Sequence, residues 1–151
     1  MVVLQNNKKA FQNYNVEDKY EAGIELEGWE VKSIENHQVD IANSFIKIRN
    51  NEAFWVNARI PAWKLGEEKS KEEENRERRL LLNRNEIKKI TQKQERVGYS
   101  IVPLKIYRAG SNYIKLEIGI GKGKKKFDKR QSLKEKDQKR RIDMDRKRYN
   151  F

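Results

Sequence analysis

The sequence predicts a mainly β protein: a small β-barrel of the oligonucleotide-binding type, with two or three embedded short helices and a basic, largely disordered C-terminal tail. Two observations carry this prediction. About six short strand-like segments precede residue 121, and they lack the repeating strand–helix–strand order of a parallel sheet. The last thirty residues hold fourteen Lys and Arg against five Asp and Glu, and so carry +9 of the net charge of +12. We therefore expect a barrel domain over residues 1–121 and a tail over residues 122–151.

The first part of the chain predicts one strand and one helix after an irregular leader. Residues 1–15 contain four asparagines and show no hydrophobic period, so no regular element is expected there. Apolar residues alternate with glutamate and glycine over residues 20–26, which is the spacing of a strand. Val31 and Ile34 lie three apart after Gly28, and this spacing predicts a short helix over residues 29–34.

A β-hairpin is predicted next. Strands are expected over residues 45–48 and 53–60, joined by a turn at Asn50, Asn51 and Glu52. Residues 67–79 are almost entirely charged, and this favours a solvated loop or an exposed helical insert.

The remaining segments predict a buried strand, a helix and two further strands. Three consecutive leucines at 80–82 predict the strand. The helix is expected to begin at an Asn85 cap, to bury Ile87, Ile90 and Val97 on one face and to end near Gly98. Alternating residues at 100–107 and 113–120 predict the last two strands.

The composition argues against an enzyme. The chain has no cysteine, which excludes a disulfide framework and thiolate metal sites, and His37 is its one histidine, in a polar stretch. No nucleophile elbow and no phosphate-binding glycine loop occurs in the sequence. We expect no catalytic residues, no metal site and no cofactor.

A net charge of +12 indicates a polyanionic partner. The apolar residues of the tail mark no single helical face, so nucleic acid is favoured over a membrane surface. No stretch approaches the length of a membrane span, and a cytoplasmic protein is expected.

Basic residues interleaved with flat side chains favour RNA. Lys8 and Lys9 precede Phe11 and Tyr14, and a lysine run at 124–126 precedes Phe127. Lysines neutralise phosphates, while aromatic rings stack on unpaired bases. A general ribosomal or structured-RNA-binding protein remains open at this point.

A magnesium-dependent nuclease also remains open. Glu30 and Lys32 have the acid-x-lysine spacing of metal-dependent nucleases, in which carboxylates hold Mg²⁺ and the lysine stabilises charge at the phosphate. The same spacing arises readily by chance in a chain of which 38% is charged.

Four segments closely resemble the SsrA-binding protein family, also called small protein B. They are Asn7-Lys8-Lys9-Ala10 with Tyr14; Tyr20-Glu21-Ala22-Gly23-Ile24 with Glu30-Val31-Lys32-Ser33; Arg79-Leu80-Leu81-Leu82-Asn83; and a last set that includes Val102-Pro103-Leu104-Lys105, Gly123-Lys124-Lys125 and Asp128-Lys129-Arg130. The resemblance covers roughly residues 6 to 140.

The resemblance implies a function in bacterial trans-translation. Members of the family bind the tRNA-like domain of transfer-messenger RNA and deliver it to stalled ribosomes, where the RNA templates a tag on the unfinished peptide. The body stands in for an anticodon arm at the decoding centre, and the tail enters the empty mRNA channel, where it becomes helical. The expected partners are therefore this RNA and the ribosome, with no membrane, and the protein is expected to be a monomer.

The resemblance also implies site residues. The expected RNA-binding residues are Asn7, Lys8, Lys9, Tyr14, Glu21, Leu81, Lys115, Gly123, Lys124 and Lys125. The residues expected to act on the ribosome are Asp128, Lys129, Arg130, Leu133, Lys134 and Glu135. In this scheme the carboxylate of Glu21 accepts hydrogen bonds from a guanine edge, Gly123 permits close backbone approach, and the lysines neutralise phosphates.

Overall fold

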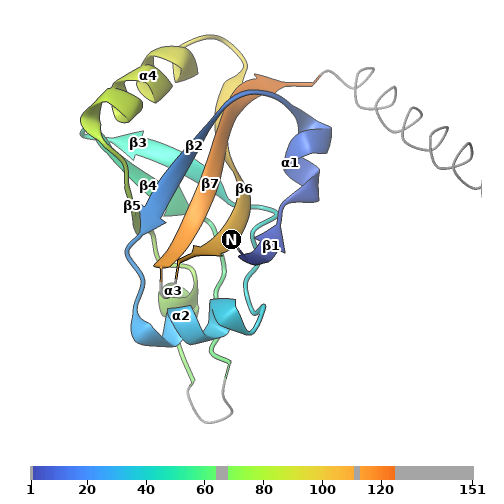
Figure 1. The fold of residues 1–151 in the computed structure, drawn as a ribbon, viewed down its shortest axis with the longest axis vertical. Helices are drawn as coiled ribbons and strands as arrows, with labels where there is room; N and C mark the ends of the chain where they lie inside the picture. The colour runs from blue at the N-terminus through green and yellow to red at the C-terminus, as the bar shows by residue number, and fades with distance from the viewer. Residues whose placement is uncertain (1, 64–67, 111–112, 125–151) are drawn as a thin grey trace, which may run out of the picture.

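Seven strands form one antiparallel sheet in a computed structural model that describes residues 2–63, 68–110 and 113–124 (Figure 1). The strand order is β1-β6-β7-β2-β5-β4-β3. The strands are β1 (Val2–Asn6), β2 (Tyr14–Ile24), β3 (Phe45–Arg49), β4 (Glu52–Val56), β5 (Arg78–Leu81), β6 (Tyr99–Ala109) and β7 (Tyr113–Gly123). The helices are α1 (Lys8–Asn13), α2 (Gly28–Glu35), α3 (Lys71–Glu74) and α4 (Arg84–Gln94).

The sheet is open rather than closed into a barrel. Its end strands, β1 and β3, each pair with one neighbour within the described residues, although β3 also approaches β6. The expectation of a mainly β fold with short helices is therefore confirmed. The expected barrel is not formed, because no backbone pairing among the described residues joins the two ends of the sheet. Expectations for residues 125–151 lie outside the described part of the chain.

The main core lies on the inner face of the sheet. Along β3, Ile46 is buried while Phe45, Lys47 and Arg49 are exposed, as the period of two in a strand requires. Trp55 of β4 is fully buried in the same core, and its indole nitrogen donates a hydrogen bond to Ser44. None of the described helices is both long and apolar enough to cross a membrane.

Helix α4 differs in detail from the sequence-based expectation. Its cap is Asn83, not Asn85: the Asn83 side chain accepts a hydrogen bond from the backbone N–H of Glu86, and the carboxylate of Glu86 accepts one from the N–H of Asn83. Ile87 and Ile90 are buried as predicted. Val97 is 94% exposed, because the helix ends at Gln94 and Val97 falls in the following turn.

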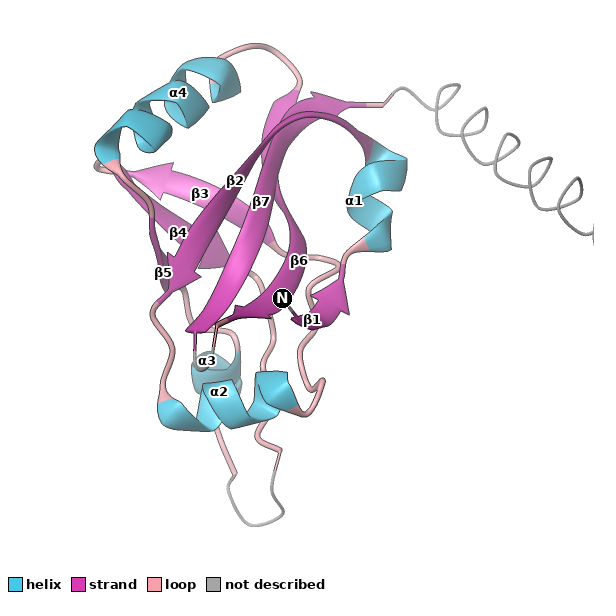
Figure 2. Cartoon of the chain, in the orientation of Figure 1, coloured by secondary structure: helices cyan, strands magenta, loops and turns pink. Residues whose placement is uncertain are grey.

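The N-terminal segment is ordered into β1, α1 and the start of β2, so the predicted irregular leader is wrong. β1 pairs with β6, about one hundred residues along the chain, with Val3 opposite Tyr107. Helix α1 lies on the outer face of the sheet (Figure 2), where Ala10 packs against Val102 and Leu104 in a second, small core. Local periodicity could not reveal these elements because their partners are distant in sequence.

The charged run at 67–79 holds regular structure and a buried ion cluster. It contains α3 and the first two residues of β5, and Arg78 is fully buried beside fully buried Glu30 of α2. The Arg78 Nε donates to Glu30 Oε2 at 2.6 Å, and its two terminal nitrogens donate to the carbonyls of Ala58 and Glu74. The prediction of a solvated loop is therefore wrong for the end of this run.

Candidate nucleic-acid interface

Gly23 brings Leu81 and Lys115 to the same face of the sheet. Gly23 of β2 lies opposite Leu81 of β5 on one side and opposite Lys115 of β7 on the other. Directly opposed residues of antiparallel strands point to one face, so the two side chains flank the glycine. A Cβ atom at Gly23 would lie 3.2 Å from the Cβ of Leu81, which makes the glycine part of this packing. Leu81 is 51% exposed, contrary to the buried strand expected at 80–82.

Glu21 lies on this face, two residues before Gly23. Its carboxylate is 4.0 Å from the Lys115 Nζ, and Tyr107 of β6 lies opposite Lys115 in the strand register. Burial, together with a hydrogen bond to Glu21, raises the pKa of Tyr107 well above its usual range. The phenol of Tyr107 therefore lies close to the Glu21 carboxylate.

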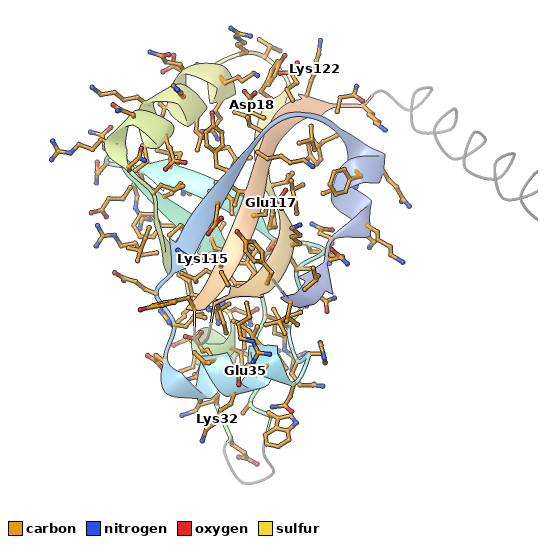
Figure 3. The ribbon with its side chains drawn as sticks, in the orientation of Figure 1. Asp18, Lys32, Glu35, Lys115, Glu117 and Lys122 are labelled. Carbon is orange, nitrogen blue, oxygen red and sulfur yellow. The ribbon has the colours of Figure 1, made fainter. Side chains whose placement is uncertain are left out.

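The charged row continues along β7 to Glu117, which Figure 3 shows beside Lys115. Glu117 pairs with the Nζ of Lys105 at 3.1 Å and with the Nζ of Lys19 at 3.8 Å. The Lys19 ammonium also lies 5.5 Å from the centre of the Phe11 ring on α1. We call this surface of Lys19, Glu21, Leu81, Lys105, Tyr107, Lys115 and Glu117 the charged face.

The charges on this face are paired, and they range from half-buried at Lys105 and Glu117 to exposed at Lys19 and Glu21. Ion pairs of solvent-exposed side chains contribute about 0–1 kcal/mol, so a ligand can replace them at little cost. The face offers carboxylates that accept hydrogen bonds from base edges and ammonium groups that attract phosphates. Its chemistry therefore suits a structured RNA.

Most of the other expected RNA-binding residues gather around α1 and the end of β7. Lys8 and Lys9 are exposed on α1, and Tyr14 lies opposite Gly123 in the β2–β7 register. The Lys124 Nζ donates to the Phe11 carbonyl at 3.1 Å, and the Lys124 backbone N–H donates to the Asn13 carbonyl at 2.8 Å. This group, the α1 cluster, is linked to the charged face by the contact between Lys19 and Phe11.

Asn7 lies in the interior rather than on either surface. It is 4% exposed; its Nδ2 donates to the Pro103 carbonyl and its backbone N–H to the Leu104 carbonyl, both at 2.8 Å. These bonds fix the start of α1 to β6. The Asn7 Oδ1 is buried without a hydrogen-bond partner.

The remaining expected site residues lie outside the described part of the chain. They are Lys125, Asp128, Lys129, Arg130, Leu133, Lys134 and Glu135.

The charged face also contains residues that the sequence-based prediction missed. Lys19, Lys105, Tyr107 and Glu117 were not among the expected site residues, yet they join Glu21 and Lys115 into one row. The period of two along β6 and β7 places Lys105 with Tyr107, and Lys115 with Glu117, on common faces. That signal was available in the sequence, but the pairing of the two strands with β2 was not.

The nuclease alternative is wrong in its choice of metal ligand. The two carboxylate oxygens of Glu30 accept hydrogen bonds from Arg76 and Arg78, and Glu30 also caps α2 through the backbone of Glu27. Burial would raise the pKa of Glu30, but these hydrogen bonds outweigh it and hold the pKa below its usual range. The described residues contain no group of three or more His, Cys, Asp or Glu side chains that could hold a metal ion.

Comparisons with known proteins agree with the resemblance. Residues 4–148 match the family model described as SmpB protein. The chain is 48% identical to the SsrA-binding protein of Fusobacterium nucleatum subsp. nucleatum over 141 residues, covering 93% of this chain and 94% of that one. It is 42% identical to the SsrA-binding protein of Thermosipho africanus over 142 residues, covering 94% and 95% of the two chains.

A solved structure shares the fold. It is a chain from the work described as "tmRNA-SmpB: a journey to the center of the bacterial ribosome". The two chains superpose with a TM-score of 0.68 at 35% identity, covering 81% of this chain and 85% of that one. The family model and the relatives extend over almost the whole sequence, and this chain therefore belongs to the SmpB protein family.

Proposed function

We propose that this protein binds the tRNA-like domain of transfer-messenger RNA and delivers it to stalled ribosomes for trans-translation. Membership of the SmpB family carries the proposal, together with the match to a chain from a structure of transfer-messenger RNA, SmpB and the bacterial ribosome. The protein acts as a binding partner and not as an enzyme. We place it in the cytoplasm as a monomer.

The charged face is the proposed primary RNA contact. Glu21, Leu81 and Lys115 converge there around Gly23, where three strands meet. A carboxylate held by Tyr107 suits a guanine edge, and exposed Leu81 offers an apolar surface to a base or ribose. Lys8, Lys9, Tyr14, Gly123, Lys124 and Lys125 would extend the contact along the phosphate backbone.

The tail is the proposed ribosome-acting part. Its sequence places Glu135 four residues before Lys139, Asp137 before Arg141 and Asp143 before Lys147, a spacing that supports a helix once RNA screens the positive charge. We propose that the body at the decoding centre stands in for an anticodon arm and that the tail enters the empty mRNA channel. Asp128, Lys129 and Arg130 would lie at its entrance, followed by Leu133, Lys134 and Glu135.

The first test compares binding to the tRNA-like domain with binding to an ordinary tRNA, at two salt concentrations and with Mg²⁺ present. A preference that persists at the higher salt, with the RNA left intact, supports recognition of shape. Equal binding that collapses with salt indicates phosphate attraction alone. That result would favour a general structured-RNA-binding protein.

Replacing Glu21 tests the charged face. Glu21→Ala should weaken binding of the tRNA-like domain by about 1.5–3 kcal/mol, the usual contribution of hydrogen bonds to a charged group. Glu25→Ala is the matched control, because Glu25 follows the end of the same strand and is also exposed. An unchanged affinity of Glu21→Ala at fixed salt would show that the face is wrongly assigned.

Truncation after Lys124 tests the tail. Loss of its lysines should weaken RNA binding moderately, whereas peptide tagging on stalled ribosomes should be abolished. Both activities can be measured with the same two protein preparations. Tagging at a normal rate by the truncated chain would contradict a role for residues 125–151 on the ribosome.

A further inference from the structure

A half-open hollow of about 330 Å³ lies between α1, the start of β3, the end of α4 and β6. Ligand sites in proteins typically measure about 300–1,000 Å³, so this hollow has room for one small molecule rather than a length of strand. It lies apart from the charged face: none of the residues that define that face lines it.

Its wall carries unused hydrogen-bonding groups. Four polar side chains line the hollow: Asn7, Asn13, Gln94 and Ser100. The Asn7 Oδ1 is a buried acceptor without a hydrogen-bond partner, which costs free energy. The side chains of Asn13, Gln94 and Ser100 make no hydrogen bond to the described residues. Amides both donate and accept, as the edge of a nucleobase does.

Flat and cationic groups complete the site. Tyr14 and Phe45 line the hollow, and Phe45 is 47% exposed although it is a large apolar side chain on an edge strand. Lys9 lines it as well, on a chain whose net charge of +12 favours a polyanion. Proteins hold unpaired RNA bases with this combination of aromatic ring, amide and cation.

We infer that this hollow binds one unpaired nucleobase of an RNA strand. The base packs against Tyr14 and Phe45, its edge bonds to Gln94 and Asn13, and Lys9 pairs with the attached phosphate. Asn7, which the resemblance placed among the RNA contacts, then forms part of the wall of the hollow rather than a surface contact. The inference rests on the proposed function only in taking RNA as the ligand. The base can come from transfer-messenger RNA or from ribosomal RNA.

The first experiment uses the full-length ¹⁵N-labelled protein and nucleoside monophosphates. Adenosine, guanosine, cytidine and uridine monophosphates are each titrated, with ribose 5-phosphate as the matched ligand that lacks a base. A nucleotide is expected to shift the amide signals of Asn13, Phe45 and Ser100, while ribose 5-phosphate does not. Equal shifts with ribose 5-phosphate, or shifts confined to other residues, would overturn the inference.

Two matched pairs of variants sharpen the test. Gln94 and Gln92 belong to the same helix, but only Gln94 lines the hollow, and alanine is a favourable helix residue at both positions. Gln94→Ala should weaken nucleotide binding about three- to tenfold, the loss expected for one hydrogen bond, and Gln92→Ala should not. Lys9→Ala should likewise weaken it more than Lys8→Ala, since Lys8 does not line the hollow. Equal effects within both pairs would refute the site.

A final comparison separates the two sources of the base. Gln94→Ala and Gln92→Ala are each bound to the tRNA-like domain and, separately, to the small ribosomal subunit. A selective loss by Gln94→Ala on either RNA supports the site and names its source, whereas no loss on both overturns it. Failure of the wild-type protein to prefer the tRNA-like domain would instead refute the proposed function. In that case nucleotide binding in the hollow still decides the present inference.

Discussion

Glu21 and Glu30 lie nine residues apart in the sequence, and both face cations in the folded protein. Glu30 is fully buried, and two arginines bind its carboxylate. Glu21 is 56% exposed and lies 4.0 Å from the nearest lysine nitrogen. The Glu30 carboxylate therefore has a structural role, while the Glu21 carboxylate can exchange its lysine for another partner. The comparison teaches that burial, not residue type, separates a structural ion pair from a surface suited to recognition.

The largest effect is expected from removing the buried charge. Glu30→Gln leaves the buried Arg78 guanidinium without its counter-charge, and breaking such a pair typically costs about 3–5 kcal/mol of the free energy of unfolding. Glu35→Gln, an exposed position on the same helix, should change stability by less than about 0.5 kcal/mol. Chemical denaturation measures both. Similar small losses of stability in the two variants would show that the buried Glu30 carboxylate has no special structural role.

Acid should weaken the same cluster. The folded state lowers the pKa of Glu30, so the stabilisation is fully present above the ordinary value of 4.5 and is lost as the pH falls through the lower folded value. The wild-type protein should therefore lose stability more steeply below pH 4.5 than Glu30→Gln does. Denaturation midpoints collected from pH 6 to pH 3 test this. Parallel curves for the two proteins would assign the acid sensitivity to other carboxyl groups.

The smallest effect should come from removing the tyrosine hydroxyl beside the exposed Glu21 carboxylate. Tyr107→Phe keeps the packing of a buried ring but removes the donor that holds Glu21. Binding of the tRNA-like domain should weaken by about 0.5–1.5 kcal/mol, the contribution of one hydrogen bond. In a Glu21→Ala background the same change should have little further effect, because its target is gone. Full additivity of the two losses would show that Tyr107 does not act through Glu21.

Local patterns in the sequence were sufficient to predict much of the sheet. Alternation of apolar and polar residues identified the hairpin of β3 and β4 and the two long strands β6 and β7, because each pair is joined by a short turn. The short helix α2 and the buried face of α4 were also predicted, since helical spacing is read within one element. The barrel was wrong because closure depends on how distant edges meet, which no local pattern records.

The missed features share one cause, a partner far along the chain. β1 forms by pairing with β6. Arg78 can be buried because its charge is balanced by Glu30, which lies 48 residues earlier in the sequence. Asn7 donates a hydrogen bond to Pro103, which lies 96 residues later. Charge and polarity favoured exposure at Arg78 and Asn7, and the long-range contacts overrode both. Within the candidate site, the resemblance supplied Glu21, Leu81 and Lys115, but only the strand register brought Tyr107 and Glu117 beside them.

The hydrogen bonds at Lys124 fix the point at which the described part of the chain ends. Its backbone N–H donates to the Asn13 carbonyl and its side chain donates to the Phe11 carbonyl, so the last described residue is held against α1. Whatever follows begins from a fixed point beside the α1 cluster. If residues 125–151 act on the ribosome as we propose, their effective concentration there depends on the length of chain that follows this fixed point. On the proposed function, residues inserted after Lys124 would therefore weaken the coupling between RNA binding by the body and the action of the tail, while every residue of both parts stays unchanged.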